Sequence, residues 1–245
     1  MGLYELLSGK LIRMKASDLA ALPFAAGAAL RHRRFFHPDG VLANGSIERL
    51  APPGEGLPVE SGDIVGRISK AVGTPGALPD AAGLAWRMPA AAFAATPWDV
   101  LLVSAGLGSS DFVANRVALR AVTSWSDALY SSLLPLNYHG ELWWIRARLT
   151  TPVDGLGLSL QAVRQHISGG GLQFEVEQAC GTSAFEPMAA LRLTTVVPLA
   201  EEGDHDVNFD PVRHTAPDVR VWPEWLRDVR SRAYRSSREG RDAET

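Results

Sequence analysis

The feature of this chain that most constrains its fold is a series of short extended segments separated by turns. Each segment alternates apolar and polar residues or is rich in β-branched residues, as β-strands are. The segments are residues 36–50, 63–70, 83–88, 99–104, 141–150, 172–179 and 188–199. Helical segments do not alternate regularly with them, so a doubly wound α/β sheet is not expected. The pattern predicts an α+β fold built on a closed antiparallel β-barrel of about eight strands.

Three other segments have the apolar spacing that is typical of helices. They are residues 17–33, residues 115–134, which end before Pro135, and a last helix that begins at Trp222. We expect these helices to lie at the periphery of the barrel. The polar residues at about 239–245 are expected to form a tail.

Length and composition limit the number of domains and the class of function. The chain has 245 residues, of which 46% are hydrophobic and 21% charged, which is ample for one compact domain and short for two. A single domain over residues 1–245 is predicted, with its core at about 31–241. The net charge of −3 provides no overall basic field, so nucleic-acid binding is not expected.

Cysteine content and hydropathy indicate the cellular compartment. Cys180 is the only cysteine, so no disulfide can form within the chain and nothing favours secretion. The apolar run at residues 19–30 contains Pro23 and is too short to span a bilayer. A cytoplasmic protein without a membrane span is therefore expected.

A motif near the C-terminus, Arg230-Ser-Arg-Ala-Tyr234, places a guanidinium and a phenol four positions apart. Side chains at i and i+4 share one face of a helix. A fixed positive charge beside a phenol stabilises the phenolate, which lowers a pKa that is ordinarily about 10. Because a phenolate is an anionic ligand for ferric iron, Tyr234 is a candidate haem-iron ligand.

Further short motifs occur along the chain in a fixed order. They are Arg34-Phe-Phe-His37, Gly66-Arg67-Ile-Ser69, Asp80-Ala-Ala-Gly83-Leu-Ala85, Trp98-Asp99 and the C-terminal Arg230 to Tyr234. With these motifs, the chain from about residue 31 to 241 resembles the catalase superfamily. The small catalase-related branch of that superfamily has a serine three residues after the tyrosine, and Ser237 matches this serine.

The resemblance implies a catalase-type barrel that binds haem b. His37 matches the distal histidine of the family, and Ser69 matches a distal serine that could hydrogen-bond the other ring nitrogen of that histidine. Tyr234 matches the tyrosinate that binds the haem iron, and Arg230 the arginine beside it. His37 and Ser69 are therefore the expected catalytic residues.

The resemblance also implies how the cofactor is held and what it reacts with. Arg34 and Arg67 are candidates for binding the haem propionates, because guanidinium groups bind carboxylates well. A neutral imidazole such as that of His37 suits proton transfer to and from a peroxide. The expected activity is that of a haem peroxidase or catalase-like oxidoreductase, with hydrogen peroxide or an organic peroxide and a small-molecule reductant as partners. A homodimer is a possible assembly.

The sequence departs from the catalase pattern on the distal side. Catalases place an asparagine shortly after the tryptophan-aspartate pair, whereas Trp98-Asp99 is followed here by Val100-Leu-Leu-Val-Ser104. Either Ser104 supplies a polar contact in its place, or Val103 leaves that wall apolar. The alternatives to a peroxidase are a haem isomerase or dehydratase of organic hydroperoxides, and a catalytically inactive binding protein with the catalase fold.

Overall fold

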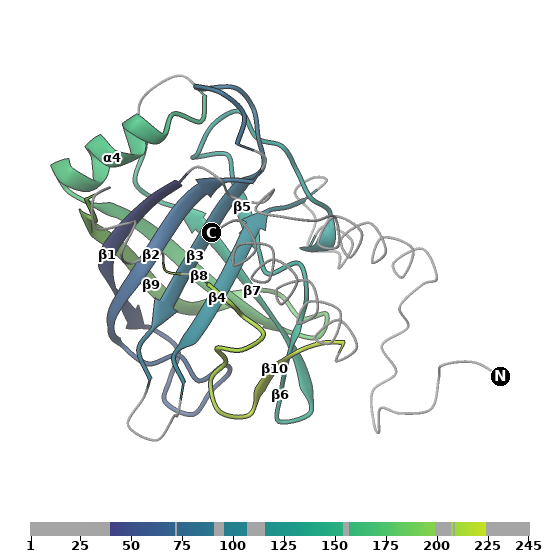
Figure 1. The fold of residues 1–245 in the computed structure, drawn as a ribbon. Helices are drawn as coiled ribbons and strands as arrows, with labels where there is room; N and C mark the ends of the chain where they lie inside the picture. The colour runs from purple at the N-terminus through teal and green to yellow at the C-terminus, as the bar shows by residue number, and fades with distance from the viewer. Residues whose placement is uncertain are drawn as a thin grey trace, which may run out of the picture.

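Ten β-strands form one antiparallel sheet in the computed structural model, which describes residues 40–71, 73–90, 96–106, 116–153, 157–198, 207 and 209–223. The strands are β1 (Gly40–Arg49), β2 (Gly62–Lys70), β3 (Ala82–Met88), β4 (Trp98–Ser104), β5 (Leu129–Ser131), β6 (Leu136–Tyr138), β7 (Glu141–Leu149), β8 (Leu172–Cys180), β9 (Glu186–Val196) and β10 (Val219–Val221). Their order is β10-β6-β7-β5-β4-β3-β2-β1-β9-β8, and β7 also pairs with β8. That additional pairing joins the sheet to itself (Figure 1). Strands β1 to β5 and β7 to β9 thus close into the eight-stranded antiparallel barrel that the sequence predicts.

The predicted strands are confirmed, and three short strands were missed. Each of the seven segments predicted from alternation contains a strand of the barrel. The missed strands, β5, β6 and β10, have three residues each, which is too few for a period of two to be recognised. Strands β6 and β10 extend the sheet beside one end of β7, where the barrel strand β5 has ended.

The helix predicted at residues 115–134 is wrong for the residues from 118 onward. Arg116 and Val117 are helical, but the segment after them forms isolated bridges and turns and then β5. Val122 forms an antiparallel bridge with Asp80, just before β3, and the backbone N–H of Arg120 donates to the carbonyl oxygen of Ser104 on β4 at 2.9 Å. Trp125 is one of the residues whose spacing suggested a helix. Its side chain is buried, although its backbone is irregular. Hydrogen bonds to the barrel strands therefore override the helical spacing here.

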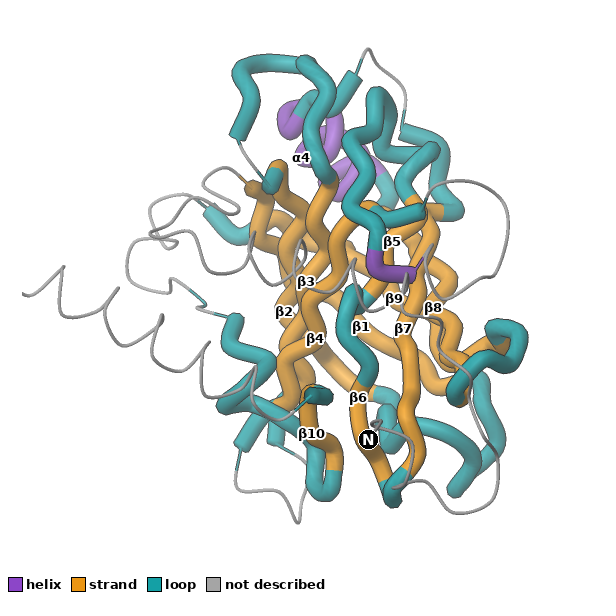
Figure 2. The backbone as a smooth tube through the Cα atoms, turned by 90° about the vertical axis from the view of Figure 1, so that its right-hand side faces the viewer, coloured by secondary structure: helices purple, strands orange, loops and turns teal. Residues whose placement is uncertain are grey.

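One helix, α4 (Leu160–Gly169), lies at one end of the barrel against β9 and β1 (Figures 1 and 2). The side chain of Ser159 caps it by accepting a hydrogen bond from the backbone N–H of Ala162. Val163 and Ile167, four positions apart, are its buried residues. The sequence analysis missed this helix. The last predicted helix does not begin at Trp222, because Trp222 and Pro223 form a bend after β10. Residues 17–33 and those from 224 onward lie outside the described residues, so the helices predicted there stay predictions.

No helix in the described part of the chain is both long enough and apolar enough to cross a membrane.

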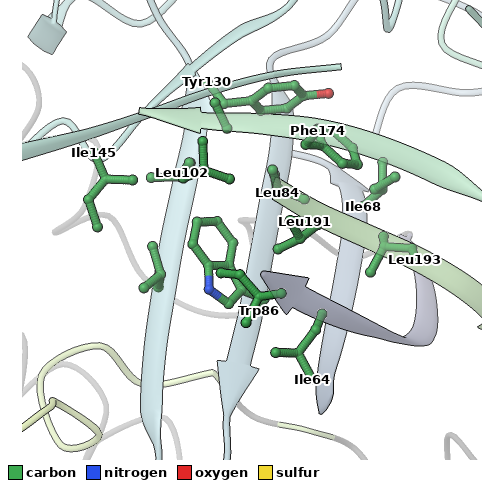
Figure 3. Close-up of a cluster of buried hydrophobic side chains, with 14 of the residues drawn as sticks. Ile64, Ile68, Leu84, Trp86, Leu102, Tyr130, Ile145, Phe174, Leu191 and Leu193 are labelled. Atoms are coloured by element: carbon green, nitrogen blue, oxygen red, sulfur yellow. The ribbon is translucent and has the colours of Figure 1, made fainter. Parts of the chain in front are cut away.

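Side chains of the barrel strands alternate between the interior and the outer face. Figure 3 shows interior side chains, including Trp86, Tyr130 and Phe174, which are almost completely buried. The rings of Tyr130 and Phe174 meet edge to face, with their centres 6.0 Å apart. Because side chains fill the interior, as they do in small barrels, groups that could contact a ligand have to lie on the outer face.

Gly45 marks a close approach of β1 to β9. The register of the two strands shifts between Asn44 and Gly45, and a Cβ atom at position 45 would overlap the carbonyl oxygen of Arg192. That oxygen belongs to the backbone and cannot rotate away. Gly45→Ala should therefore lower the free energy of unfolding by about 1–3 kcal/mol, as overpacking does. Urea denaturation measures this loss.

Gly62→Ala is the matched control, because a Cβ atom at position 62 meets nothing within 4 Å. This change should alter the free energy of unfolding by less than about 0.5 kcal/mol. Equal stability of the Gly45→Ala and Gly62→Ala proteins would contradict the close approach of β1 to β9.

Candidate functional site

Two rows of outward-facing residues cross β1, β2, β3 and β4 in register. The first, which we call the serine row, consists of Gly40, Ser69, Gly83 and Val103. The second, the arginine row, consists of Leu42, Arg67, Ala85 and Leu101. Apart from Ser69 and Arg67, these residues are apolar, and half of them are glycine or alanine. The rows therefore form a low, mostly apolar surface that carries one hydroxyl and one guanidinium.

Gly40 leaves the space that the side chain of Arg67 occupies. A Cβ atom at position 40 would lie 2.5 Å from Nε of Arg67 and 3.1 Å from Cβ of Ser69. The carbonyl oxygen of Gly40 accepts a hydrogen bond of 3.2 Å from Nη2 of Arg164 on α4. The start of β1 is thus held between the arginine row and α4.

Ser104 and Val103 lie on opposite sides of the barrel wall. Ser104 is fully buried and faces inward, where its hydroxyl accepts a hydrogen bond of 2.9 Å from the backbone N–H of Ala82. The same hydroxyl donates to the carbonyl oxygen of Arg120 at 2.5 Å. Val103 faces outward beside Gly83. The sequence left two alternatives at the place of the catalase asparagine, a polar contact from Ser104 or an apolar wall at Val103. The structure has Val103 facing outward.

Asp99 links the chain that follows the barrel to the outer face of β3 and β4. Its carboxylate has no exposed surface and accepts two hydrogen bonds of 2.6 Å from Arg87. It also accepts one of 2.7 Å from the backbone N–H of Asp210, and Nδ1 of His214 lies 2.8 Å away. The hydrogen bond to Asp99 raises the pKa of Arg87. A buried carboxylate with this many partners is a strong anchor.

Phe209 borders the arginine row on the side toward Asp99. It is buried with Leu42 and Val197 in a small apolar cluster outside the barrel, and Ala85 and Leu101 pack against this cluster. The guanidinium of Arg87 lies 5.6 Å from the centre of the Phe209 ring. The cluster around Phe209 therefore covers part of the arginine row.

The structure describes two of the six predicted site residues. Ser69 and Arg67 are two positions apart on β2 and face the same outer side; Ser69 is buried and Arg67 is half-buried. The other four lie outside the described residues, and their roles stay predictions: Arg34, His37, Arg230 and Tyr234. Among the described residues, no group of three or more His, Cys, Asp or Glu side chains could hold a metal ion.

Two tyrosines, Tyr130 and Tyr138, lie within the described ranges. Tyr130 lies in the barrel interior, and burial raises the pKa of its phenol, so it stays neutral. Tyr138 lies on β6, where its ring contacts that of His139 with centres 4.0 Å apart. Neither belongs to β1–β4.

Sequence reasoning missed the Arg87–Asp99–His214 cluster. Asp99 entered the sequence analysis only as half of the Trp98-Asp99 motif, and His214 was not assigned a partner. The two residues are 115 positions apart, and no local pattern joins residues at such a separation. The one signal was the charge of Asp99 in an otherwise apolar strand. A charged residue is rarely buried unless it is paired.

The closed barrel has the fold of the catalases. Its structure is similar to catalase A from Saccharomyces cerevisiae, with a TM-score of 0.59 and 10% identity over 91% of this chain and 64% of that chain. A fungal catalase gives 0.57 and 10% identity over 91% and 62% of the two chains, and a bacterial catalase 0.55 and 13% over 92% and 62%. The chain thus spans less than two thirds of the length of these catalases. No family model and no curated protein matches the sequence.

Asp99→Asn tests the anchor on the outer face. The substitution leaves the guanidinium of Arg87 without its charged partner, and should lower the free energy of unfolding by about 2–4 kcal/mol. Because the side chain of Arg87 is 24% exposed, water compensates part of the loss. Thermal and urea denaturation measure the effect.

Glu175→Gln provides the comparison on the opposite side of the barrel. Glu175 pairs with Arg148 at 3.2 Å, but both side chains are more than half exposed. Its substitution should change the free energy of unfolding by less than about 0.5 kcal/mol. An Asp99→Asn protein as stable as the Glu175→Gln protein would show that Asp99 is no anchor.

Proposed function

We propose that the protein is a haem-dependent peroxidase or catalase-like oxidoreductase. The observation that carries the proposal is the outer face of β1–β4 in a catalase-type barrel, where Ser69 and Arg67 lie on one low apolar surface. Hydrogen peroxide or an organic peroxide would be the oxidising substrate, and a small molecule would be the reductant.

The residues of the two rows fit a haem in size and polarity. Gly83 and Ala85 project little from β3, so a flat apolar ring could lie close to the strand. Arg67 offers a guanidinium to a propionate carboxylate. Neither row contains a carboxylate that would repel a propionate.

Each proposed site residue has a distinct role. Bound haem would supply the redox chemistry that breaks the O–O bond of the peroxide. His37 would take the proton from the peroxide and return it to the departing oxygen. Ser69 would hydrogen-bond the other ring nitrogen of His37 and thereby set its tautomer. Tyr234 would bind the iron as a phenolate, kept ionised by Arg230, while Arg34 and Arg67 would hold the propionates.

Covalent geometry limits the distance between His37 and Gly40, the first residue of the serine row. Three peptide units separate it from Gly40, and consecutive Cα atoms are about 3.8 Å apart, so their Cα atoms are at most about 11 Å apart. Gly40 pairs directly with Ser69. A hydrogen bond between His37 and Ser69 is therefore compatible with the register of β1 and β2.

Purified protein reconstituted with haem should show a Soret band of high-spin ferric iron bound by tyrosinate. Tyr234→Phe should abolish or shift this band, because a phenyl ring cannot bind iron. His37→Ala should keep the band and slow peroxide consumption by about 10²- to 10⁴-fold, the usual contribution of a general acid–base. Absorption spectroscopy and stopped-flow kinetics measure the two effects.

Tyr138→Phe is the control for the proposed iron ligand. It removes a phenol from β6, away from β1–β4, and should leave the Soret band unchanged. The absence of a Soret band after reconstitution would contradict haem binding and favour an inactive binding protein. Equal rates of peroxide consumption in the wild type and His37→Ala would refute the acid–base role.

Arg67→Ala should weaken haem binding about ten- to a hundredfold, because a hydrogen bond to a charged group contributes about 1.5–3 kcal/mol. Titration of the haem-free protein with haem measures the loss. Arg67→Lys keeps the charge without the forked geometry and should recover part of the affinity. Arg213→Ala removes a half-exposed guanidinium beside Asp210 and should leave the affinity unchanged. Equal weakening by Arg67→Ala and Arg213→Ala would argue against propionate binding by Arg67.

A haem isomerase or dehydratase of organic hydroperoxides is a second candidate, and the outward position of Val103 favours it. An enzyme of this kind would rearrange the hydroperoxide without a reductant. Product analysis separates the two candidates. Consumption of an organic hydroperoxide without added reductant, with a rearranged product in place of the alcohol, would favour the second.

A further inference from the structure

We propose that Gly40 is a positioning residue for Arg67: the space that it leaves on the barrel wall directs the guanidinium of Arg67 to the carboxylate of a ligand. This role rests on the proposed binding of haem to the same face, where the carboxylate is a haem propionate. It deepens that function, because it accounts for how a long side chain is kept at one place on β2. The register of β1 and β2 and the space at position 40 carry it.

The side chain of Arg67 reaches from its own row toward the serine row. On the ladder of β1 and β2, Arg67 lies opposite Leu42, whereas Gly40 lies opposite Ser69. A Cβ atom at position 40 would nevertheless lie 2.5 Å from Nε of Arg67. Because the central carbon of the guanidinium is bonded to Nε, the positive charge of Arg67 lies beside Gly40.

Three atoms of described residues would crowd a side chain at position 40, and only one of them can move readily. The carbonyl oxygen of Ile68, 2.9 Å from the added Cβ atom, belongs to the backbone. The Cβ atom of Ser69, at 3.1 Å, is bonded directly to the backbone. Nε of Arg67 belongs to a long side chain with several rotatable bonds. Any side chain at position 40 would therefore displace the guanidinium of Arg67.

The backbone of Gly40 is held on two sides, so β1 cannot readily withdraw to make room. Gly40 forms the first pair of the ladder with β2, opposite Ser69. From α4, Nη2 of Arg164 donates a hydrogen bond of 3.2 Å to the carbonyl oxygen of Gly40. The φ angle of Gly40 lies outside the left-handed region, so its backbone conformation alone would admit any residue. Glycine is needed here for the space that Arg67 occupies.

A guanidinium that is already held in place binds a carboxylate better than one that samples many rotamers. Binding then loses less conformational entropy, and the forked donors keep their alignment with the carboxylate oxygens. Gly40 has no side chain of its own to offer a ligand. Its contribution to affinity would therefore act through Arg67.

A double-mutant cycle tests this dependence. Gly40→Ala should weaken haem binding about tenfold, because a displaced guanidinium makes a poorly aligned hydrogen bond to the propionate. In the Arg67→Ala protein, the same substitution should leave the affinity unchanged, since no guanidinium remains to be displaced. Titration of the haem-free proteins with haem measures the cycle. An equal loss of affinity in both backgrounds would overturn the positioning role.

Gly45→Ala is the matched control for a general loss of stability. Position 45 lies on the same strand, but its added Cβ atom overlaps the carbonyl oxygen of Arg192 and not Arg67. This protein should be less stable than the wild type and should still bind haem with wild-type affinity at a temperature at which it is folded. A loss of haem affinity as large as that of Gly40→Ala would show that the effect is merely structural.

Haem dimethyl ester, in which the propionates are methyl esters, separates the carboxylate from the ring. The ester has no charged oxygen for Arg67 to bind, so Gly40→Ala and the wild type should bind it with equal affinity. A tenfold loss with the ester as well would show that the substitution disturbs the seat of the ring, and would overturn the proposed role.

Chemical labelling of Arg67 tests the geometry in the absence of haem. Phenylglyoxal modifies guanidinium groups, and mass spectrometry of peptides identifies the modified positions. Labelling of Arg67 should be several-fold faster in Gly40→Ala than in the wild type, because the guanidinium has left the space beside position 40. The half-exposed guanidinium of Arg213 should keep its rate and is the internal reference.

The labelling result also separates this role from the proposed function. An unchanged rate at Arg67 would overturn the positioning role even in a protein that binds haem. A faster rate in a protein without a Soret band would support the placement of Arg67 by Gly40 and overturn haem as the ligand. If Gly40→Ala alone does not fold, adding Arg67→Ala should restore folding, because it removes the displaced side chain. Failure to restore folding would contradict the proposed role.

Discussion

The pairing of β7 with β8 closes the sheet, and this closure determines where a functional site can lie. A closed barrel has no strand edges to present to a ligand, and its interior is small enough to be filled by side chains. Trp86, Tyr130 and Phe174 fill it here. Because strand residues alternate between two faces, about every second residue of β1–β4 faces outward. Ser69, Arg67 and the apolar residues around them are therefore brought together by the barrel wall itself.

The buried carboxylate of Asp99 provides the second constraint. A charge without solvent contact is costly unless it is paired and hydrogen-bonded. Asp99 meets this requirement with Arg87 from the neighbouring strand and with Asp210 and His214 from the chain that follows the barrel. Its backbone N–H also donates to the carbonyl oxygen of His214 at 2.9 Å. The segment that leads toward the C-terminal motif is thus held on the face that carries Arg67.

The strands could be predicted from sequence because alternation is a local property, and the closed barrel followed from their number and from the lack of alternating helices. What depends on distant partners could not. The bridge of Val122 with Asp80 replaced a helix that residues 115–134 suggested by themselves. The missed helix α4 had local signals, with Ser159 as N-cap and Val163 and Ile167 four positions apart.

The candidate site shows the same limit. Residues 100–104 read Val-Leu-Leu-Val-Ser, and a run that is nearly all apolar does not reveal which residues face outward. The sequence therefore left Ser104 and Val103 as alternatives. Pairing of Gly83 with Val103 sets the phase of β4, and the hydrogen bonds of Ser104 to Ala82 and Arg120 agree with it.

The barrel fold restricts the inward-facing residues of this chain more than the outward-facing ones. The barrel requires only that inward residues be apolar and of suitable volume, and many sequences satisfy that requirement. This explains how the same architecture is kept at 10–13% identity to the catalases compared. Outward positions such as Arg67 and Val103 are not bound by that requirement, so they can change while the interior and the barrel stay the same.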